Sequence, residues 1–162
     1  MDTENSSLNP IDIVEDVIYQ KKWNFSRAAE HELVAEIESQ WCQYRLYFTW
    51  SENISAMSFT ITFDLCFPQS KFNKAYELLG LINEKLWIGH FDVTNKNGIP
   101  AYRHTVFSSS NNDLLHKKLE DLLDIGIYEC EKYYPSFQQV LFEDISPKEA
   151  IKFSDFEVIG RA

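Results

Sequence analysis

The chain has 162 residues, of which 44% are apolar and 15% aromatic, and its formal net charge is −10 at pH 7. This composition is typical of a folded protein with a full hydrophobic core and excludes a disordered or fibrous chain. The negative charge disfavours direct nucleic-acid binding, because phosphate groups would be repelled. We expect residues 1–8 to form a flexible N-terminal tail and residues 9–162 to form a single domain.

The sequence shows neither an export signal nor a membrane span. Residues 1–10, MDTENSSLNP, are acidic and polar, whereas a signal peptide is basic and then apolar. Apolar runs stay well short of the roughly 18 residues that a membrane-spanning helix requires. We therefore expect a cytoplasmic protein that has no membrane partner.

The cysteines Cys42, Cys66 and Cys130 are far apart in the sequence and odd in number. That pattern fits neither a disulfide framework nor the ligand spacing of a zinc site, so we expect reduced thiols and no bound metal. The sequence also lacks a glycine-rich phosphate loop and an HExxH motif, and we predict no cofactor.

The predicted elements begin with a helix over about residues 10–21, where Asn9 and Pro10 form a start signal ahead of apolar residues at helical spacing. The apolar period then changes to two, as in half-buried strands. This alternation predicts strands over about residues 23–27, 33–37, 42–50 and 57–67. Ser70 is the predicted cap of a second helix, which leads into the next strand pair.

Residues 85–107 hold an Asn-Gly pair between two alternating segments, which predicts a β-hairpin. A two-residue type I′ turn at Asn97 and Gly98 would set Asp92 directly opposite Arg103. In that register one face carries Trp87, Phe91, Tyr102 and His104, and the other carries His90, Asp92, Ala101 and Arg103. Pro100 cannot donate a backbone hydrogen bond and therefore predicts a sheet edge near the turn.

A long helical tract follows, which we expect Pro135 to interrupt, and Ser146 with Glu149 forms a capping box for a further helix. The resulting element order is α-β-β-β(-β)-α-β-β-α with additional C-terminal helices. An antiparallel sheet with helices packed on one face is the economical way to bury such elements, so the predicted fold class is α+β.

The polar face of the hairpin offers the main candidate chemistry. This face could bind an anion, or hold a histidine as a general base oriented by a carboxylate, through His90, Asp92 and Arg103. The favoured interpretation is a solvated ion pair between Asp92 and Arg103, because the sequence places no nucleophile or second carboxylate beside them. We therefore predict no catalytic residues and no enzymatic activity.

A second polar surface is predicted on the strands over residues 42–50 and 57–67. Once helices cover one sheet face, the other presents Arg45, Tyr47, Thr49, Thr60, Thr62 and Asp64. Such a face mixes hydroxyls, charges and one aromatic ring, and a partner or a second copy could complete it. Tyr47 and Thr60 are the predicted binding residues there.

Four sequence segments carry a family resemblance: LINEKLWIGHFDV, YRHTVF, YECEKYYPSF and SPKEAI. In combination they resemble the YbjN family of bacterial proteins, often labelled sensory transduction regulators. The family's GHFD falls on residues 89–92 and its RH on Arg103 and His104, without an established catalytic role. The resemblance also implies a domain similar to type III secretion chaperones, which hold partner polypeptides and are often dimeric.

Two hypotheses about function follow from these patterns. The first is a non-enzymatic regulatory or chaperone-like module that binds an unidentified protein or peptide through a sheet face or edge, with a homodimer as one arrangement. The alternative is a small-ligand sensor or enzyme that uses the polar hairpin face around His90, Asp92 and Arg103. A ligand-sized concave pocket or a broad apolar patch on the folded domain would separate the two.

Overall fold

The computed structural model describes residues 9–108 and 111–159, so the predicted tail over residues 1–8 lies outside the described residues. One antiparallel sheet has the strand order β1-β2-β3-β4-β6-β5. Its strands are β1 (Asn24–Ala29), β2 (Glu32–Glu38), β3 (Gln43–Ser51), β4 (Ala56–Thr62), β5 (His90–Val93) and β6 (Pro100–Phe107). The helices are α1 (Pro10–Gln20), α2 (Phe72–Asn83), α3 (Asn112–Phe142) and α4 (Pro147–Ile159). The predicted α+β class is confirmed.

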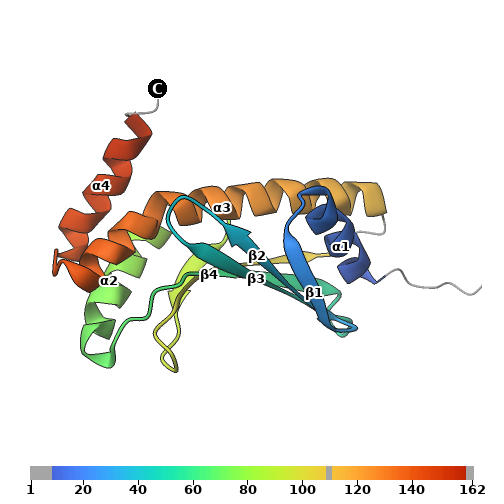
Figure 1. Cartoon of the computed structure of the whole chain (residues 1–162), viewed down its shortest axis with the longest axis horizontal. Helices are drawn as coiled ribbons and strands as arrows, with labels where there is room; N and C mark the ends of the chain where they lie inside the picture. Colours follow the sequence, from blue (N-terminus) through green and yellow to red (C-terminus); the bar gives the residue numbers. More distant parts are fainter. Residues whose placement is uncertain (1–8, 109–110, 160–162) are drawn as a thin grey trace, which may run out of the picture.

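The helices of the described residues lie on one side of the sheet, where α3 runs lengthwise above the strands in the view of Figure 1. α1 packs against α3, β2 and β3 near one end, while α2 and α4 contact each other and α3 near the other end. Within residues 9–108 and 111–159, the opposite side of the sheet carries no helix. The strands therefore have one face in the core and one open face.

The ends of the helices follow the predicted signals in part. Asn9 caps α1 through its side-chain oxygen, which accepts a hydrogen bond from the backbone of Ile11. The predicted Ser70 cap is wrong, because residues 69–71 form a single 3-10 turn and α2 begins at Phe72. The Ser146 hydroxyl accepts a hydrogen bond from the Glu149 backbone at 3.3 Å, as predicted for the start of α4.

α3 continues through Pro135 as one helix, so the predicted interruption is wrong. A proline inside a helix costs about 3 kcal/mol, because it removes a hydrogen bond and crowds the preceding turn. Here the flanking residues Tyr134, Ser136 and Phe137 are all buried in the core. Their packing offsets the local cost of the proline.

The hairpin register differs from the prediction by two residues. Val93 pairs with Pro100, so residues 94–99 form a six-residue loop in place of a two-residue turn. Arg103 consequently lies opposite His90, and Ala101 lies opposite Asp92. A shift of two residues keeps every side chain on its face, because the side-chain period of a strand is two. The predicted placement of His90 and His104 on opposite faces is therefore confirmed, while the direct Asp92–Arg103 pairing is wrong.

Contacts with the segment after β4 explain the longer loop. Of the two residues Asn97 and Gly98, only Gly98 has a positive φ, +69°, so the pair cannot form a type I′ turn. The Gly98 N–H donates to the Thr94 carbonyl at 2.8 Å, and the Gly98 carbonyl accepts from the Phe67 N–H at 2.8 Å. A Cβ at Gly98 would lie 2.1 Å from the Phe67 carbonyl oxygen. This tertiary contact, which no local pattern encodes, holds the loop open.

The predicted sheet edge at Pro100 is wrong, because β6 lies between β4 and β5. It is the first residue of β6, and its carbonyl accepts a hydrogen bond from Phe63 just beyond the end of β4. A missing N–H is tolerated at the start of a strand. The edge beside it is β5, and the side chain of Asn83 caps that edge. The Asn83 amide accepts from the Phe91 N–H at 2.7 Å and donates to the Phe91 carbonyl at 3.0 Å.

Trp87 also departs from the prediction. The sequence predicts Trp87 on the same hairpin face as Phe91, but β5 begins only at His90 and Trp87 is 99% exposed. Gly89, with a φ of +71°, turns the chain just before the strand. The alternating pattern of the sequence therefore extends further than the strand itself.

Candidate functional site

The open face of the sheet is built from two rows of side chains, each crossing all the strands. The first row runs Ser26, Val34, Tyr47, Thr60, Arg103 and His90. The second row runs Asn24, Glu36, Arg45, Thr62, Ala101 and Asp92. We call these residues together the open face.

The two rows unite the two surfaces that the sequence analysis treated separately. Tyr47 and Thr60 come from β3 and β4, whereas His90, Asp92 and Arg103 come from the hairpin. Because β6 pairs with β4, Arg103 lies directly opposite Thr60, and Thr60 lies opposite Tyr47. Four of the five predicted binding residues thus stand in one row, with Asp92 in the next.

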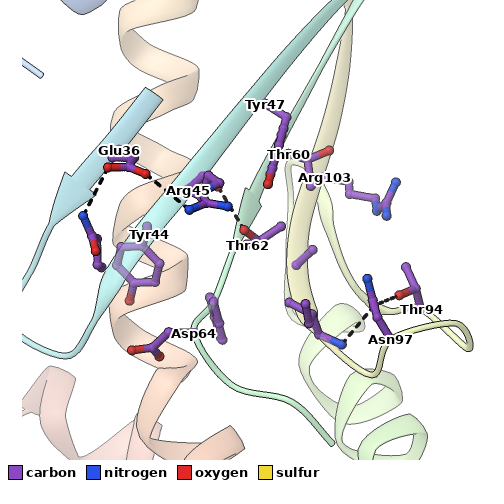
Figure 2. A pocket seen from close by; sticks show the side chains of 14 residues that line it. Glu36, Tyr44, Arg45, Tyr47, Thr60, Thr62, Asp64, Thr94, Asn97 and Arg103 are labelled. Carbon is purple, nitrogen blue, oxygen red and sulfur yellow. Dashed lines mark hydrogen bonds and ion pairs between the residues drawn. The ribbon is translucent and has the colours of Figure 1, made fainter. Parts of the chain in front are cut away.

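A hollow of about 590 Å³ occupies part of this face, over β3, β4 and β6 (Figure 2). Its floor includes Ala101, whose small side chain is 2% exposed, and the 94–99 loop contributes Thr94, Asn97 and Ile99 to its wall. Arg103, Tyr47 and Thr60 line the hollow, whereas His90 and Asp92 are not among its lining residues. The volume is in the range of small-ligand sites, although the hollow is widely open.

Arg45 is the centre of a polar group at the β2 side of the hollow. Its guanidinium lies 3.3 Å from the Glu36 carboxylate, and Glu36 also accepts a hydrogen bond from Gln43. Figure 2 shows Arg45 between Glu36 and Thr62, and the Thr62 hydroxyl donates to the Arg45 backbone carbonyl at 3.2 Å. Tyr47 first, and then Glu36, raises the pKa of Arg45, so this side chain is a permanent cation.

Arg103 stands at the β5 side of the hollow. Its Nε atom is 3.5 Å from a carboxylate oxygen of Asp92, which is an ion pair but too long and misaligned for a hydrogen bond. The Nε atom itself is buried and has no hydrogen-bond partner among the residues that the structure describes. Both side chains are about two-fifths exposed, at 40% and 43%, so the pair contributes little to stability. The predicted Asp92–Arg103 ion pair therefore exists, but as a diagonal contact.

At the lower end of the hollow in Figure 2, Asp64 accepts a hydrogen bond from the Tyr134 hydroxyl at 2.8 Å. Burial, and then this hydrogen bond, raises the pKa of Tyr134 above its ordinary value. Tyr44 is fully buried beside it, and burial chiefly raises its pKa as well. Both phenols are therefore neutral at physiological pH and cannot act as bases there.

Nucleophilic chemistry has no ready group at the hollow. In the described part of the chain, its lining holds no cysteine, serine or histidine. Cys42 and Cys130 lie in the core, where burial raises the pKa of Cys42 to about 12 and that of Cys130 well above its ordinary value. Neither thiol is ionised near neutral pH, and all three cysteines are free. The side chains that line the hollow offer hydroxyls, guanidinium groups and aromatic rings, which suit it to binding a ligand.

His104 belongs to the other face. Its ring meets the edge of Phe59 with the centroids 5.9 Å apart, and the side chain is partly buried. Burial, and then the proximity of His90, lowers the pKa of His104. His104 is therefore a half-buried residue on the helix-covered face.

Sequence reasoning missed some residues of the site. Glu36 pairs with Arg45 in the second row, and its alternation with Ala35 and Ile37 could have placed it there. Thr94 and Asn97 could not be assigned, because their position depends on the six-residue loop. Asn83 carries no sequence signal for its role at the β5 edge, since it ends an ordinary amphipathic helix.

Comparison with known families identifies the chain. The YbjN family, described as "Putative bacterial sensory transduction regulator", matches residues 10–139. The chain belongs to the YbjN family. No curated protein and no solved structure matches it, so the predicted likeness to type III secretion chaperones stays a prediction.

The YbjN match includes all six strands and the whole open face, whereas α4 (Pro147–Ile159) lies beyond it. The candidate site therefore belongs to the YbjN domain itself. Membership of the YbjN family supports a regulatory role in coarse terms.

Two further findings describe the YbjN protein. None of the helices in residues 9–108 and 111–159 has the length and apolarity that crossing a bilayer demands. Within those same residues, His, Cys, Asp and Glu side chains nowhere gather in threes as they would around a metal ion.

Proposed function

We propose that this YbjN protein is a non-enzymatic, cytoplasmic regulatory module that binds a segment of a partner polypeptide on its open face. The observation that carries the proposal is the pair of side-chain rows that crosses the whole sheet and that no helix of the described part of the chain covers. The face combines an aromatic ring, hydroxyls and two arginines. Tyrosine and arginine are the residue types that dominate binding energy at protein interfaces.

Both edges of the sheet are poorly suited to the addition of a partner strand, which favours the face as the docking surface. At β5 the outward N–H and carbonyl of Phe91 are already bonded to Asn83. At β1 the register shifts between Arg27 and Ala29, and such irregularities protect an edge from further pairing. A chaperone-like role, with the domain holding a partner until release, agrees with this geometry.

The direct test is site-specific photo-crosslinking in the native cells. A crosslinking amino acid at Thr60 on the open face is compared with one at Glu120, a partly exposed residue of α3. We expect a partner protein to be captured reproducibly from position 60 and not from position 120. The purified partner should then bind the wild-type chain and fail to bind the Tyr47→Glu, Thr60→Lys double variant. Equal capture from both positions would contradict docking on the open face.

A second candidate function is the sensing of a small ligand, and the hollow favours it because 590 Å³ is enough for a metabolite-sized molecule. Native mass spectrometry of the protein purified from its own cells separates the two functions. A small molecule that copurifies with the wild-type chain and is lost from the Arg103→Ala variant would support the sensor. A partner polypeptide that copurifies with the wild-type chain and is lost from the Arg103→Ala variant would support the polypeptide-binding module.

A further inference from the structure

The arginines of the described residues differ in how well they are paired. Arg27 is held by two carboxylates, at 2.7 Å from Asp12 and 3.0 Å from Glu15. Arg45 has one carboxylate contact at 3.3 Å, and Arg103 has one at 3.5 Å that is not a hydrogen bond. A guanidinium offers a planar fork of N–H donors that fits a carboxylate in a bidentate manner. The two arginines of the hollow therefore keep donors that the chain itself does not use.

The charge of the hollow is distinct from that of the whole protein. Its lining contains Arg45 and Arg103 against Glu36 and Asp64, so the charges there sum to zero. The complete chain carries −10, which must therefore lie on other residues. At physiological ionic strength, charges beyond about 8 Å are largely screened, so an anion in the hollow responds mainly to the groups that line it and to Asp92, which lies 3.5 Å from Arg103.

The sheet geometry places a polar bridge between the two arginines. Arg45 is opposite Thr62 and Arg103 is opposite Thr60, so both threonines of β4 lie between the guanidinium groups (Figure 2). β3 and β6 are separated by two strand spacings, about 10 Å, which is within the combined reach of two arginine side chains. The Thr60 hydroxyl makes no hydrogen bond within the described residues and can serve a ligand.

We propose that the hollow recognises a carboxylate of the bound partner segment, an aspartate or glutamate side chain that sits between Arg45 and Arg103 and reaches the Thr60 hydroxyl. The inference rests on the proposed function and names the chemistry by which the open face selects its partner. The incoming carboxylate shares Arg45 with Glu36 and accepts from the terminal N–H groups of Arg103, whose Nε is buried beside Asp92. Ala101, on the floor between Thr62 and Asp92, leaves room for the incoming side chain.

The test uses a phage-displayed library of random peptides, selected against the wild-type protein and against three variants. Arg45→Gln and Arg103→Gln remove one guanidinium each, and Lys117→Gln on the surface of α3 is the control with the same charge change. We expect the wild type to enrich peptides with an aspartate or glutamate at a fixed position. Each arginine variant should bind those peptides about tenfold or more weakly, and the control should bind them equally well. Thermal melting of each variant checks that the fold is intact.

Peptides in which the fixed acidic residue is replaced by its amide should lose a similar factor on the wild type and a smaller factor on Arg103→Gln, where only Arg45 still binds the carboxylate. Enriched peptides that lack an acidic preference, yet fail to bind the Tyr47→Glu, Thr60→Lys variant, would overturn the carboxylate proposal and leave the docking face standing. Peptides that bind this double variant as well as the wild type would instead overturn the proposed function. Succinate that binds the wild type as tightly as the best peptide would assign the site to a free carboxylate and also overturn the proposal.

Discussion

The helix-covered face and the open face of this sheet are made by the same strands, yet they have opposite properties. Between the two open-face rows runs a core row, which consists of Phe25, Ala35, Leu46, Ile61, Tyr102 and Phe91. All of these except Phe25 are buried. Neighbouring residues in one strand therefore belong to the core or to the candidate site according to parity alone. We conclude that stability and recognition are separated at the level of single residues, which makes the difference easy to test.

The largest loss of stability is expected from a substitution in the core row. Phe91 is 1% exposed, and its ring meets Phe63, Tyr102, Tyr133 and Phe137. We predict that Phe91→Ala lowers the free energy of unfolding by about 3–5 kcal/mol, because it removes a large apolar side chain and leaves a cavity. Urea denaturation measures the change.

The matched control for Phe91 is its neighbour Asp92, which faces solvent. Asp92→Ala should cost at most about 1 kcal/mol, because only an exposed ion pair with Arg103 is lost. Similar losses for the two variants would mean that the β5 residues do not divide between a core face and an open face.

A smaller loss of stability is expected at the β5 edge. Asn83→Ala removes both hydrogen bonds to the backbone of Phe91, and we predict a loss of about 1–3 kcal/mol because the two groups are left without partners. The Phe91 amide should also exchange its hydrogen faster. Since an uncapped edge can pair with another chain, the variant should associate with itself at high concentration.

Asn83→Asp gives the matched comparison at that edge. Its carboxylate can still accept from the Phe91 N–H, but it faces the Phe91 carbonyl with no proton to donate. We therefore expect the aspartate variant to retain slow exchange at the Phe91 amide while still losing stability. Fast exchange in both variants would show that the acceptor oxygen of Asn83 is not what protects this amide.

These edge contacts also show where prediction from sequence stops. The alternation of apolar residues was sufficient to assign each strand residue to a face, because this needs only the odd or even position along the strand. The two-residue shift of the hairpin leaves that assignment unchanged. Register was not predictable from the Asn-Gly pair, since the loop conformation depends on the hydrogen bond between Gly98 and Phe67. The binding residues were predicted as two groups, and their union in one row required the pairing of β4 with β6. That pairing joins segments separated by α2 and carries no local signal.

The dependence of stability on pH should distinguish the two histidines of the hairpin, His90 and His104. The pKa of His104 is lowered from 6.5, chiefly by burial and also by His90. The unfolded chain then binds a proton at this position at a higher pH than the folded chain does. The contribution of His104 to stability is therefore fully present above about pH 6.5 and is lost as the pH falls toward its folded pKa.

We predict that His104→Gln flattens this part of the stability profile, measured by urea denaturation at a series of pH values below 6.5. His90→Gln is the control, because it removes the lesser cause and leaves the burial of His104 in place. The His90 variant should keep most of the dependence of the unfolding free energy on pH. An unchanged slope in the His104 variant would assign the acid sensitivity to other groups.

The smallest effect on stability is expected on the open face itself, where binding should respond instead. Tyr47 is 38% exposed and Thr60 stands beside it in the first row, so neither contributes much to the core. We predict that Tyr47→Glu with Thr60→Lys changes the free energy of unfolding by no more than about 0.5 kcal/mol. The same double variant should abolish capture of the partner polypeptide, and it should weaken any self-association seen by light scattering. Binding or association that persists while the fold collapses would show that this face is part of the core. The assignment of the two faces would then have to be reversed, because no residue can serve both sides of one strand.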